Sequence, residues 1–291
     1  PRGVKHVKRT LKRKPKADII FDCTGFKSLF NDSEWIDYDY LPNNSAWVTR
    51  VHYDDKNEQI KPVTDCTALS SGWVWNVPTW DTIGTGYVYC DKFLTKKQAI
   101  KEFRDYLTEN VQSDCGCYTD KLFRQIKFKT GRREEIWKDD VVSIGLSAGF
   151  VEPLESNGLL SIHNFLLYFI RVMENKTNVT QFMRDTFNNH CAFSFDGFAS
   201  FVGLHYALTQ RNDSPYWRAV SQIKYPYDNM FKNAQITFME ESHNLHEKIN
   251  WKHGDSLWCV MAGHGWNPFN PVIDNTIDMW DSVPAAFKNM E

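Results

Sequence analysis

Four consecutive residues, Glu155, Ser156, Asn157 and Gly158, are of types that suit chemistry on an anion. A carboxylate accepts protons, and here a hydroxyl follows it directly. An apolar, helix-like run starts at Asn157, and the first N–H groups of a helix have no partner inside it. These groups and the positive end of the helix dipole stabilise an anion. The spacing therefore predicts a proton acceptor held beside an anion-binding pair of amides.

The same residues also fit a structural role. Acidic and hydroxyl residues are favoured around the N-cap of any helix, so Glu155 and Ser156 suit an ordinary helix start. Glu152 lies three residues earlier and is separated from Glu155 by a proline. Spacing alone does not choose between the two interpretations.

The segment before these residues has the pattern of a strand and a turn. The apolar residues Val141, Val142 and Ile144 lead to Gly145. From Asn157 to Glu174, apolar residues cover more than one face of a helix, which predicts burial on several sides. The order is therefore strand, irregular turn and helix N-terminus.

A second strand is predicted in residues 17–25, where an apolar run ends at Gly25. Ligands collect at the carboxyl ends of strands in open α/β sheets, so Asp22, Thr24 and Gly25 are candidates to face a cofactor. A plain strand and turn is the alternative.

Residues 47–89 have β-like patterning, and Lys96 to Leu107 has the periodicity of an amphipathic helix. Trp73 and Trp75 are two positions apart, which puts both indoles on one face of a strand. They either wall an aromatic site or fill a sheet–helix interface.

The composition of the 291 residues, 42% hydrophobic and 24% charged, is that of a globular protein. Residues 1–16 hold eight Lys or Arg and no acid, and valines within them favour a solvated strand pair over a nucleic-acid-binding arm. No apolar run reaches the roughly 18 residues that span a bilayer. We expect neither nucleic acid nor membrane as a partner.

The seven cysteines are scattered, and Cys115 and Cys117 are the only close pair. No second pair or histidine spacing completes a zinc site, so no metal is expected. Reduced thiols in a cytoplasmic protein are the simplest account.

The stretch from Phe150 to Gly158, FVEPLESNG, resembles the FVEPLES-T-G signature of flavin-dependent halogenases, especially the tryptophan-halogenase branch. Asn157 stands where Thr is usual. Four further stretches resemble motifs of this family in the same order: DCTGF (22–26), GWVWNVP (72–78), GTGYVY (84–89) and HYALTQRNDSPYWR (205–218).

The resemblance implies roles for individual residues. Glu155 is catalytic, Ser156 connects it towards the halide, and the backbone amides of Asn157 and Gly158 hold chloride or bromide. The residues implied to contact the flavin cofactor are Thr24, Gly25, Gly145, Leu146 and Leu159, and those near flavin or substrate are Trp73, Trp75, Pro78 and Phe150. Arg132 and Arg133, just before the signature, either meet an anionic cofactor or are exposed.

The implied reaction is halogenation of an aromatic substrate such as an indole. FADH2 reacts with O2, the flavin hydroperoxide oxidises the halide, and the hypohalous acid attacks the ring. A separate flavin reductase supplies FADH2, and a homodimer is possible. Glu155 orients the electrophile or takes the proton from the ring.

The implied fold is α/β (α+β), part of a flavoprotein-monooxygenase-like FAD-binding fold. We expect the end of an FAD-binding domain in residues 1–30, a substrate-facing sheet in 31–135, a return to the FAD-binding domain in 136–175 and a helical cap over the substrate in 176–291. The G-x-G-x-x-G loop and the catalytic lysine of the family are not found, so we expect a C-terminal portion of a longer enzyme.

Three alternatives remain open from the sequence. An aromatic monooxygenase would pass oxygen straight to the substrate. A glycoside hydrolase would use Glu152 and Glu155 as a carboxylate pair, although three positions and a proline suit that geometry badly. A portion without the nucleotide loop and lysine is also compatible with a catalytically silent chain.

Overall fold

The computed structural model describes residues 3–8, 10–11, 13–111, 122–174, 176, 178–223, 225, 259–260 and 263–265. Contacts divide the chain into two compact units, Pro1–Asp39 with Phe128–Ala199 and Tyr40–Lys127 with Ser200–Glu291. We call them unit 1 and unit 2. Sheets and helices occur in both, which confirms the predicted mixed α/β class. The sequence predicts four segments, with boundaries after residues 30, 135 and 175, and a functional role for each segment. This division stays a prediction.

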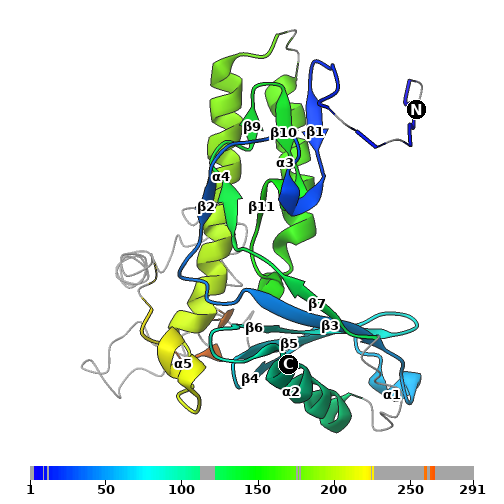
Figure 1. Ribbon diagram of the computed structural model, residues 1–291, viewed down its shortest axis with the longest axis vertical. Helices are drawn as coiled ribbons and strands as arrows, with labels where there is room; N and C mark the ends of the chain where they lie inside the picture. Colours follow the sequence, from blue (N-terminus) through cyan, green and yellow to red (C-terminus); the bar gives the residue numbers. More distant parts are fainter. Residues whose placement is uncertain are drawn as a thin grey trace, which may run out of the picture. The chain divides into compact units, whose positions relative to one another are not determined.

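Unit 1 contains two small sheets (Figure 1). In the first, β1 pairs in parallel with β10, which pairs antiparallel with β9; in the second, β8 lies between β11 and β2. The strands are β1 (Ile20–Asp22), β10 (Val141–Ser143), β9 (Trp137–Lys138), β11 (Gly149–Phe150), β8 (Gly131–Arg133) and β2 (Trp35–Asp37). The strands predicted within residues 17–25 and before Gly145 are confirmed.

An aromatic layer joins the sheet to α3 (Asn157–Met173) and α4 (Gln181–Ala207), whose residues after Ala199 belong to unit 2. The fully buried indole of Trp137 lies 5.0 Å from the ring of Phe169 and 5.6 Å from that of Phe187, centroid to centroid. Such aromatic pairs stabilise a core beyond the area they bury. The layer fixes α3 beside the parallel strands.

The predicted burial of α3 on several sides is wrong for the described residues. Phe165 is 1% exposed, whereas Leu159 is 81% and Ile170 is 61% exposed. Only the face that carries Phe165 meets the aromatic layer. An apolar pattern shows which faces of a helix are hydrophobic, but it does not show which other elements cover those faces.

Unit 2 is built on one antiparallel sheet with the strand order β4-β5-β6-β3-β7 (Figure 1). Its strands are β4 (Asp65–Leu69), β5 (Gly72–Pro78), β6 (Ile83–Tyr89), β3 (Ser45–Val51) and β7 (Arg124–Lys127), and the short α1 (Lys56–Gln59) follows β3. The β-like patterning of residues 47–89 therefore corresponds to four of these strands and α1.

One face of this sheet packs on α2 (Lys96–Asn110), which confirms the helix predicted from Lys96 to Leu107. Thr95 starts α2 with a capping box, because its side chain accepts from the N–H of Gln98 and the Gln98 side chain accepts from the N–H of Thr95. The core between sheet and helix includes Trp47, Val51, Val74, Ile83, Tyr87, Ala99, Phe103 and Leu107.

Hydrogen bonds attach α5 (Pro215–Val220) to the turn between β4 and β5. The Ser214 hydroxyl caps α5 at the Trp217 N–H and donates to the carbonyl of Ser70 at 2.6 Å. Trp217 Nε1 donates to the carbonyl of Leu69 at 2.7 Å. The motif at residues 205–218 thus fastens the helical part of unit 2 to its sheet.

The strand pair predicted in residues 1–16 is wrong for the described residues there, which form no strand. Consecutive lysines and arginines repel one another, and Lys14 is held by an ion pair with Asp140 instead of a strand ladder. Cys115 and Cys117 lie outside the described residues.

Candidate active site

Two turns meet at the carboxyl ends of the parallel strands of unit 1. Asp22, the last residue of β1, is in register with Ser143, the last of β10, and the Asp22 carbonyl accepts from the N–H of Ile144 at 2.9 Å. The short 3-10 helices that follow, η1 (Gly25–Lys27) and η3 (Gly145–Ser147), are therefore in contact. This edge is where open α/β sheets bind ligands.

The first turn is organised by the buried carboxylate of Asp22. It accepts from the N–H of Thr24 at 2.9 Å, from the Thr24 hydroxyl at 2.6 Å and from the N–H of Phe30 at 3.0 Å. Asp22 itself therefore holds the turn and does not face a ligand. Next to it, burial and then the charge of Asp22 raise the pKa of the Cys23 thiol, which favours the protonated form.

Thr24 and Gly25 are at the surface of this turn. The Thr24 hydroxyl also accepts from the N–H of Leu29, so its hydrogen-bonding capacity serves the fold. Gly25 has a φ of +81° and open space around its Cα, where a Cβ would meet no atom within 4 Å. Close approach of a ligand at this turn would therefore be to backbone.

The second turn contains the predicted cofactor residues Gly145 and Leu146. Gly145 has a φ of +67°, which a glycine adopts without strain, and a Cβ there would lie 3.3 Å from the Ile162 side chain of α3. Leu146 and Leu159 both expose their side chains. The structure thus brings Thr24, Gly25, Gly145 and Leu146 together at one edge, with two exposed leucines available for an apolar ring.

The helix α3 begins at Asn157, where the sequence predicts a helix start. The 3-10 helix η4 (Pro153–Glu155) leads into Ser156, which adopts the left-handed conformation with a φ of 53° and ψ of 27°. A non-glycine residue in this region carries strain of about 1 kcal/mol or more, and such strain clusters at functional sites. Here it turns the chain abruptly into the helix.

The first amides of α3 are available to a ligand. Ser156 makes no capping hydrogen bond, and among the described residues no group accepts from the N–H of Asn157 or Gly158. A Cβ on Gly158 would meet no atom within 4 Å. The Asn157 amide nitrogen Nδ2 is buried and makes no hydrogen bond within the described part of the chain. Three donors at this helix end are therefore without an acceptor among the described residues.

The two carboxylates before α3 differ in exposure. Glu152 is 2% exposed, whereas Glu155 is half-buried and is the last residue of η4. Of the two, only Glu155 is accessible, and it stands two residues before Asn157. This difference favours Glu155 for chemistry and gives Glu152 a structural position.

The tryptophan pair belongs to unit 2. Trp73 and Trp75 lie on the same face of β5, with ring centroids 5.9 Å apart, and Trp73 is buried while Trp75 is half-buried. Pro78 ends the same strand. In unit 1, Phe150 packs edge-to-face against Phe26 of η1 at 5.5 Å, next to the turns described above.

Arg132 is not exposed, and its guanidinium binds a protein carboxylate. Its Nε and Nη2 donate to the Asp196 carboxylate at 2.8 and 3.0 Å, and the Tyr38 hydroxyl donates to the same carboxylate at 2.5 Å. Arg133 donates to the carbonyl of Ser33 at 2.6 Å. From the sequence, Arg132 is expected either to meet a cofactor or to be exposed to solvent. Its actual partner could not be predicted, because Asp196 is 64 positions away.

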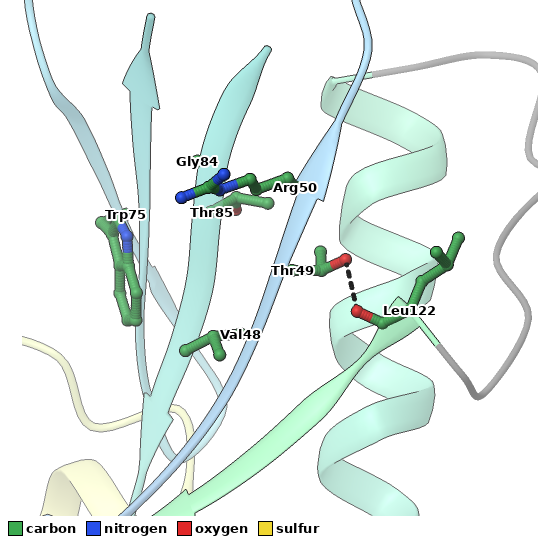
Figure 2. Close-up of a pocket in the computed structure, with 7 residues that line it drawn as sticks. All are labelled: Val48, Thr49, Arg50, Trp75, Gly84, Thr85 and Leu122. Carbon is green, nitrogen blue, oxygen red and sulfur yellow. Dashed lines mark hydrogen bonds between the residues drawn. The ribbon is translucent and has the colours of Figure 1, made fainter. Parts of the chain in front are cut away.

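Sequence reasoning also missed Arg50 of β3. Its side chain lines a pocket of unit 2 with Val48, Trp75 and Gly84 (Figure 2). The available signal was the alternation of glycines in GTGYVY, which leaves one face of β6 without side chains at positions 84 and 86.

No group of three or more His, Cys, Asp and Glu side chains is placed to hold a metal ion within the described ranges. No described helix has the length and apolar character needed to cross a bilayer.

The comparisons with known proteins agree with one another. Tryptophan 7-halogenase RebH of Lentzea aerocolonigenes is 30% identical over 281 residues, which cover 88% of this chain and 50% of the relative. Tryptophan 6-halogenase SttH of Streptomyces toxytricini is 35% identical over 206 residues, covering 69% of this chain and 38% of the relative. The solved structure of BrvH, a flavin-dependent halogenase from Brevundimonas sp. BAL3, superposes with a TM-score of 0.75 at 26% identity and covers 94% of this chain and 54% of its own.

These likenesses place the chain among the flavin-dependent halogenases. The sequence profile described as tryptophan halogenase matches residues 2–276, and the chain belongs to this family. It spans about half the length of the curated relatives it matches.

Proposed function

We propose that this chain supplies the halide-binding and flavin-facing residues of a halogenase that acts on an aromatic, indole-like substrate. The observation that carries the proposal is the start of α3, where the amides of Asn157 and Gly158 have no acceptor in the described chain and Glu155 stands two residues before Asn157. Family membership supports the same assignment.

The donors at this helix end suit chloride or bromide. A halide accepts hydrogen bonds from several directions and is stabilised by the positive end of a helix dipole. The N–H groups of Asn157 and Gly158 would bind it, and Asn157 Nδ2 would add a third donor in place of the hydroxyl that the usual threonine carries. The Ser156 hydroxyl would link this halide to Glu155.

The turns at the edge of β1 and β10 suit a flavin. Thr24, Gly25 and Gly145 would let its polar parts approach backbone, while Leu146, Leu159 and Phe150 would contact the ring system. Trp73, Trp75 and Pro78 would lie near flavin or substrate. When bound, reduced flavin with O2 supplies the two-electron oxidant of the halide.

Glu155 would act on the substrate ring. The balanced reaction converts one aromatic C–H, one halide, O2, FADH2 and one proton into the aryl halide, FAD and two waters. Carbon–halogen bond formation breaks the aromaticity of the ring, and Glu155 would take the proton whose loss restores it. A half-buried carboxylate is suited to this general-base step.

The proposed reaction implies a partner protein and a cellular location. FADH2 must come from a separate flavin reductase, and we expect both proteins in the cytoplasm. A homodimer is compatible with the proposal.

The test is halogenation of indole substrates by the chain with a flavin reductase, NADH, FAD, O2 and either chloride or bromide. A halogen isotope pattern in the product supports a halogenase, whereas a hydroxylated product that forms without halide supports the aromatic monooxygenase. Glu155→Gln should lower the rate by roughly 10²–10⁴-fold, because it removes the base. Glu174→Gln, an exposed carboxylate at the other end of α3, is the matched control. Equal rates for Glu155→Gln and the control would remove Glu155 from the mechanism.

A further inference from the structure

The segment that carries Glu155 and the open amides of α3 begins at the short strand β11 (Figure 1). We call residues 149–158 the signature segment. β11 pairs antiparallel with β8, and the backbone hydrogen bond from Ser156 to the Pro153 carbonyl is local to the turn that follows. The position of Glu155 therefore depends on the elements that hold the two ends of this segment.

An ion pair fixes the strand with which β11 pairs. Arg132 of β8 is in register with Gly149 of β11, and its guanidinium donates to the Asp196 carboxylate of α4 at 2.8 and 3.0 Å. The Tyr38 hydroxyl donates to the same carboxylate at 2.5 Å. The Arg132 side chain is mostly buried and that of Asp196 is half exposed. Two parallel charge-assisted hydrogen bonds are strong and fix the geometry of both partners. The pair thus holds β8, and through it β11, on α4.

The residue before Asp196 contacts β11 directly. A Cβ at Gly149 would lie 2.8 Å from the Cζ atom of Phe195 and 2.9 Å from the carbonyl of Gly131. A glycine within a strand often marks such a close approach by another element. The absence of a side chain at Gly149 lets the buried Phe195 ring lie against the strand backbone.

Phe195 also reaches the helix that follows the signature segment. Its ring packs edge-to-face on that of Phe165 of α3, with centroids 5.2 Å apart, and both rings are buried. Edge-to-face aromatic pairs have a preferred geometry. Two neighbouring residues of α4, Phe195 and Asp196, therefore hold the strand before the segment and the helix after it, and all of these contacts lie within unit 1.

We propose that Asp196 is a positioning residue for halide oxidation and transfer, which acts through Arg132 and β8 to hold Glu155 and the amides of Asn157 and Gly158 in place. This inference rests on the proposed function and adds to it a residue that takes no part in the chemistry itself. Such support has large effects, because a displacement of about 1 Å at reacting groups can lower a rate by about 100-fold.

The test measures the halogenation rate of the full chain as a function of bromide, with flavin reductase, NADH, FAD, O2 and indole. In Asp196→Asn and Arg132→Gln, the half-maximal bromide concentration should rise by about 3- to 10-fold and the rate at saturating bromide should fall by about 10- to 100-fold, because the donors no longer converge on the halide and Glu155 is displaced. Loss of folded protein lowers the rate alone. A changed half-maximal concentration therefore reports position.

The two variants complement each other. Asp196→Asn leaves a mostly buried guanidinium without its counter-charge, whereas Arg132→Gln leaves a half-exposed carboxylate that water can solvate, so the second is the milder change for folding. The double variant should be no worse than either single variant, because both changes remove the same pair. Arg132→Lys keeps the charge and loses the two-bond geometry, and it should give an intermediate half-maximal concentration.

Two other variants on α4 are matched controls. Asp185→Asn removes an exposed carboxylate that accepts from Gln181. Asn188→Ala removes two hydrogen bonds to the backbone of Trp137 in β9, so it weakens the hold of α4 on unit 1 away from the signature segment. Each should change the half-maximal bromide concentration by less than about 3-fold. Thermal unfolding of all variants shows how much stability each one loses.

Chloride binding without flavin separates this inference from the proposed function. The chain should broaden the chlorine NMR line of a chloride solution, and Asp196→Asn should reduce this broadening while Asp185→Asn retains it. Equal half-maximal bromide concentrations in Asp196→Asn, Arg132→Gln and Asp185→Asn would overturn the positioning role even in a chain that halogenates. Broadening that depends on Asp196 in a chain that halogenates nothing would leave the positioning role standing and reject the proposed function. A chain that neither halogenates nor broadens the line would overturn both.

Discussion

At the scale of single residues, Asn157 distinguishes this chain from the usual family signature. Its Nδ2 is buried without an acceptor in the described part of the chain, directly beside two open backbone amides. Leaving a buried donor unsatisfied costs roughly 1–3 kcal/mol. A bound halide would satisfy it.

We therefore expect Asn157→Ala to raise the halide concentration for half-maximal rate by roughly 3- to 10-fold, since one net hydrogen bond contributes about 1 kcal/mol. The backbone donors remain in this variant, so activity should persist. Asn157→Asp is nearly isosteric and places a negative charge at the site, and it should abolish halide use. Halide titrations of the three proteins measure this, and an unchanged half-maximal concentration in Asn157→Ala would show that Nδ2 is not a halide ligand.

At the scale of elements, Asp91 ties the start of β3 and the end of β7 to the end of β6. Asn44 Nδ2 donates to its carboxylate at 2.7 Å, and Lys127 Nζ donates at 3.1 Å. The hydrogen bond from Asn44 is the main cause that lowers the pKa of Asp91, and Lys127 adds to it. A carboxylate with a lowered folded-state pKa stabilises the fold above its unfolded pKa of about 3.9, and this contribution is lost as the pH falls through the folded-state pKa.

Asp91→Asn should therefore lower the free energy of unfolding at pH 7 by about 1 kcal/mol, because the exposed Lys127 contributes little. The deficit should shrink as the pH falls below about 4, where the wild-type carboxylate also becomes neutral. Urea unfolding at both pH values measures the change. Asp105→Asn, which breaks an exposed pair with Lys101 on α2, should have little effect at either pH. A deficit for Asp91→Asn that is equal at both pH values would contradict the electrostatic account.

At the scale of the whole molecule, the two units differ in how their sheets are held. In unit 2, β6 is paired on both sides along all seven of its residues, and Tyr87 and Val88 have no exposed surface. In unit 1, β1 has three residues and is paired on one side in the described sheet. Local opening is easiest where few buried contacts and short ladders hold a segment.

Native-state hydrogen exchange should therefore find the slowest amides in β5 and β6 and faster exchange in β1 and β10. The difference should correspond to an opening free energy well below that of global unfolding for unit 1. Mass spectrometry after timed exchange and proteolysis resolves the two sets of peptides. Equal protection in both sets would show that the units open together.

The local pattern of the sequence was sufficient for several elements. The 3.6-residue periodicity predicts α2, and the apolar run after Ser156 predicts the start of α3, because helix formation depends on neighbours three and four residues apart. The open amides of Asn157 and Gly158 follow from the same local logic, since every helix start has unpaired N–H groups.

Only the tertiary structure decided what these elements face. Pairing of β1 with β10 joins Asp22 to Ser143 across 121 positions, brings the turns η1 and η3 into contact, and turns the Asp22 carboxylate inward. The partner of Arg132 and the pocket beside Arg50 depend in the same way on residues distant in sequence. Periodicity indicates which faces of a helix or strand are apolar. Contacts between distant segments depend on packing and charge pairing, which a short stretch of sequence does not contain.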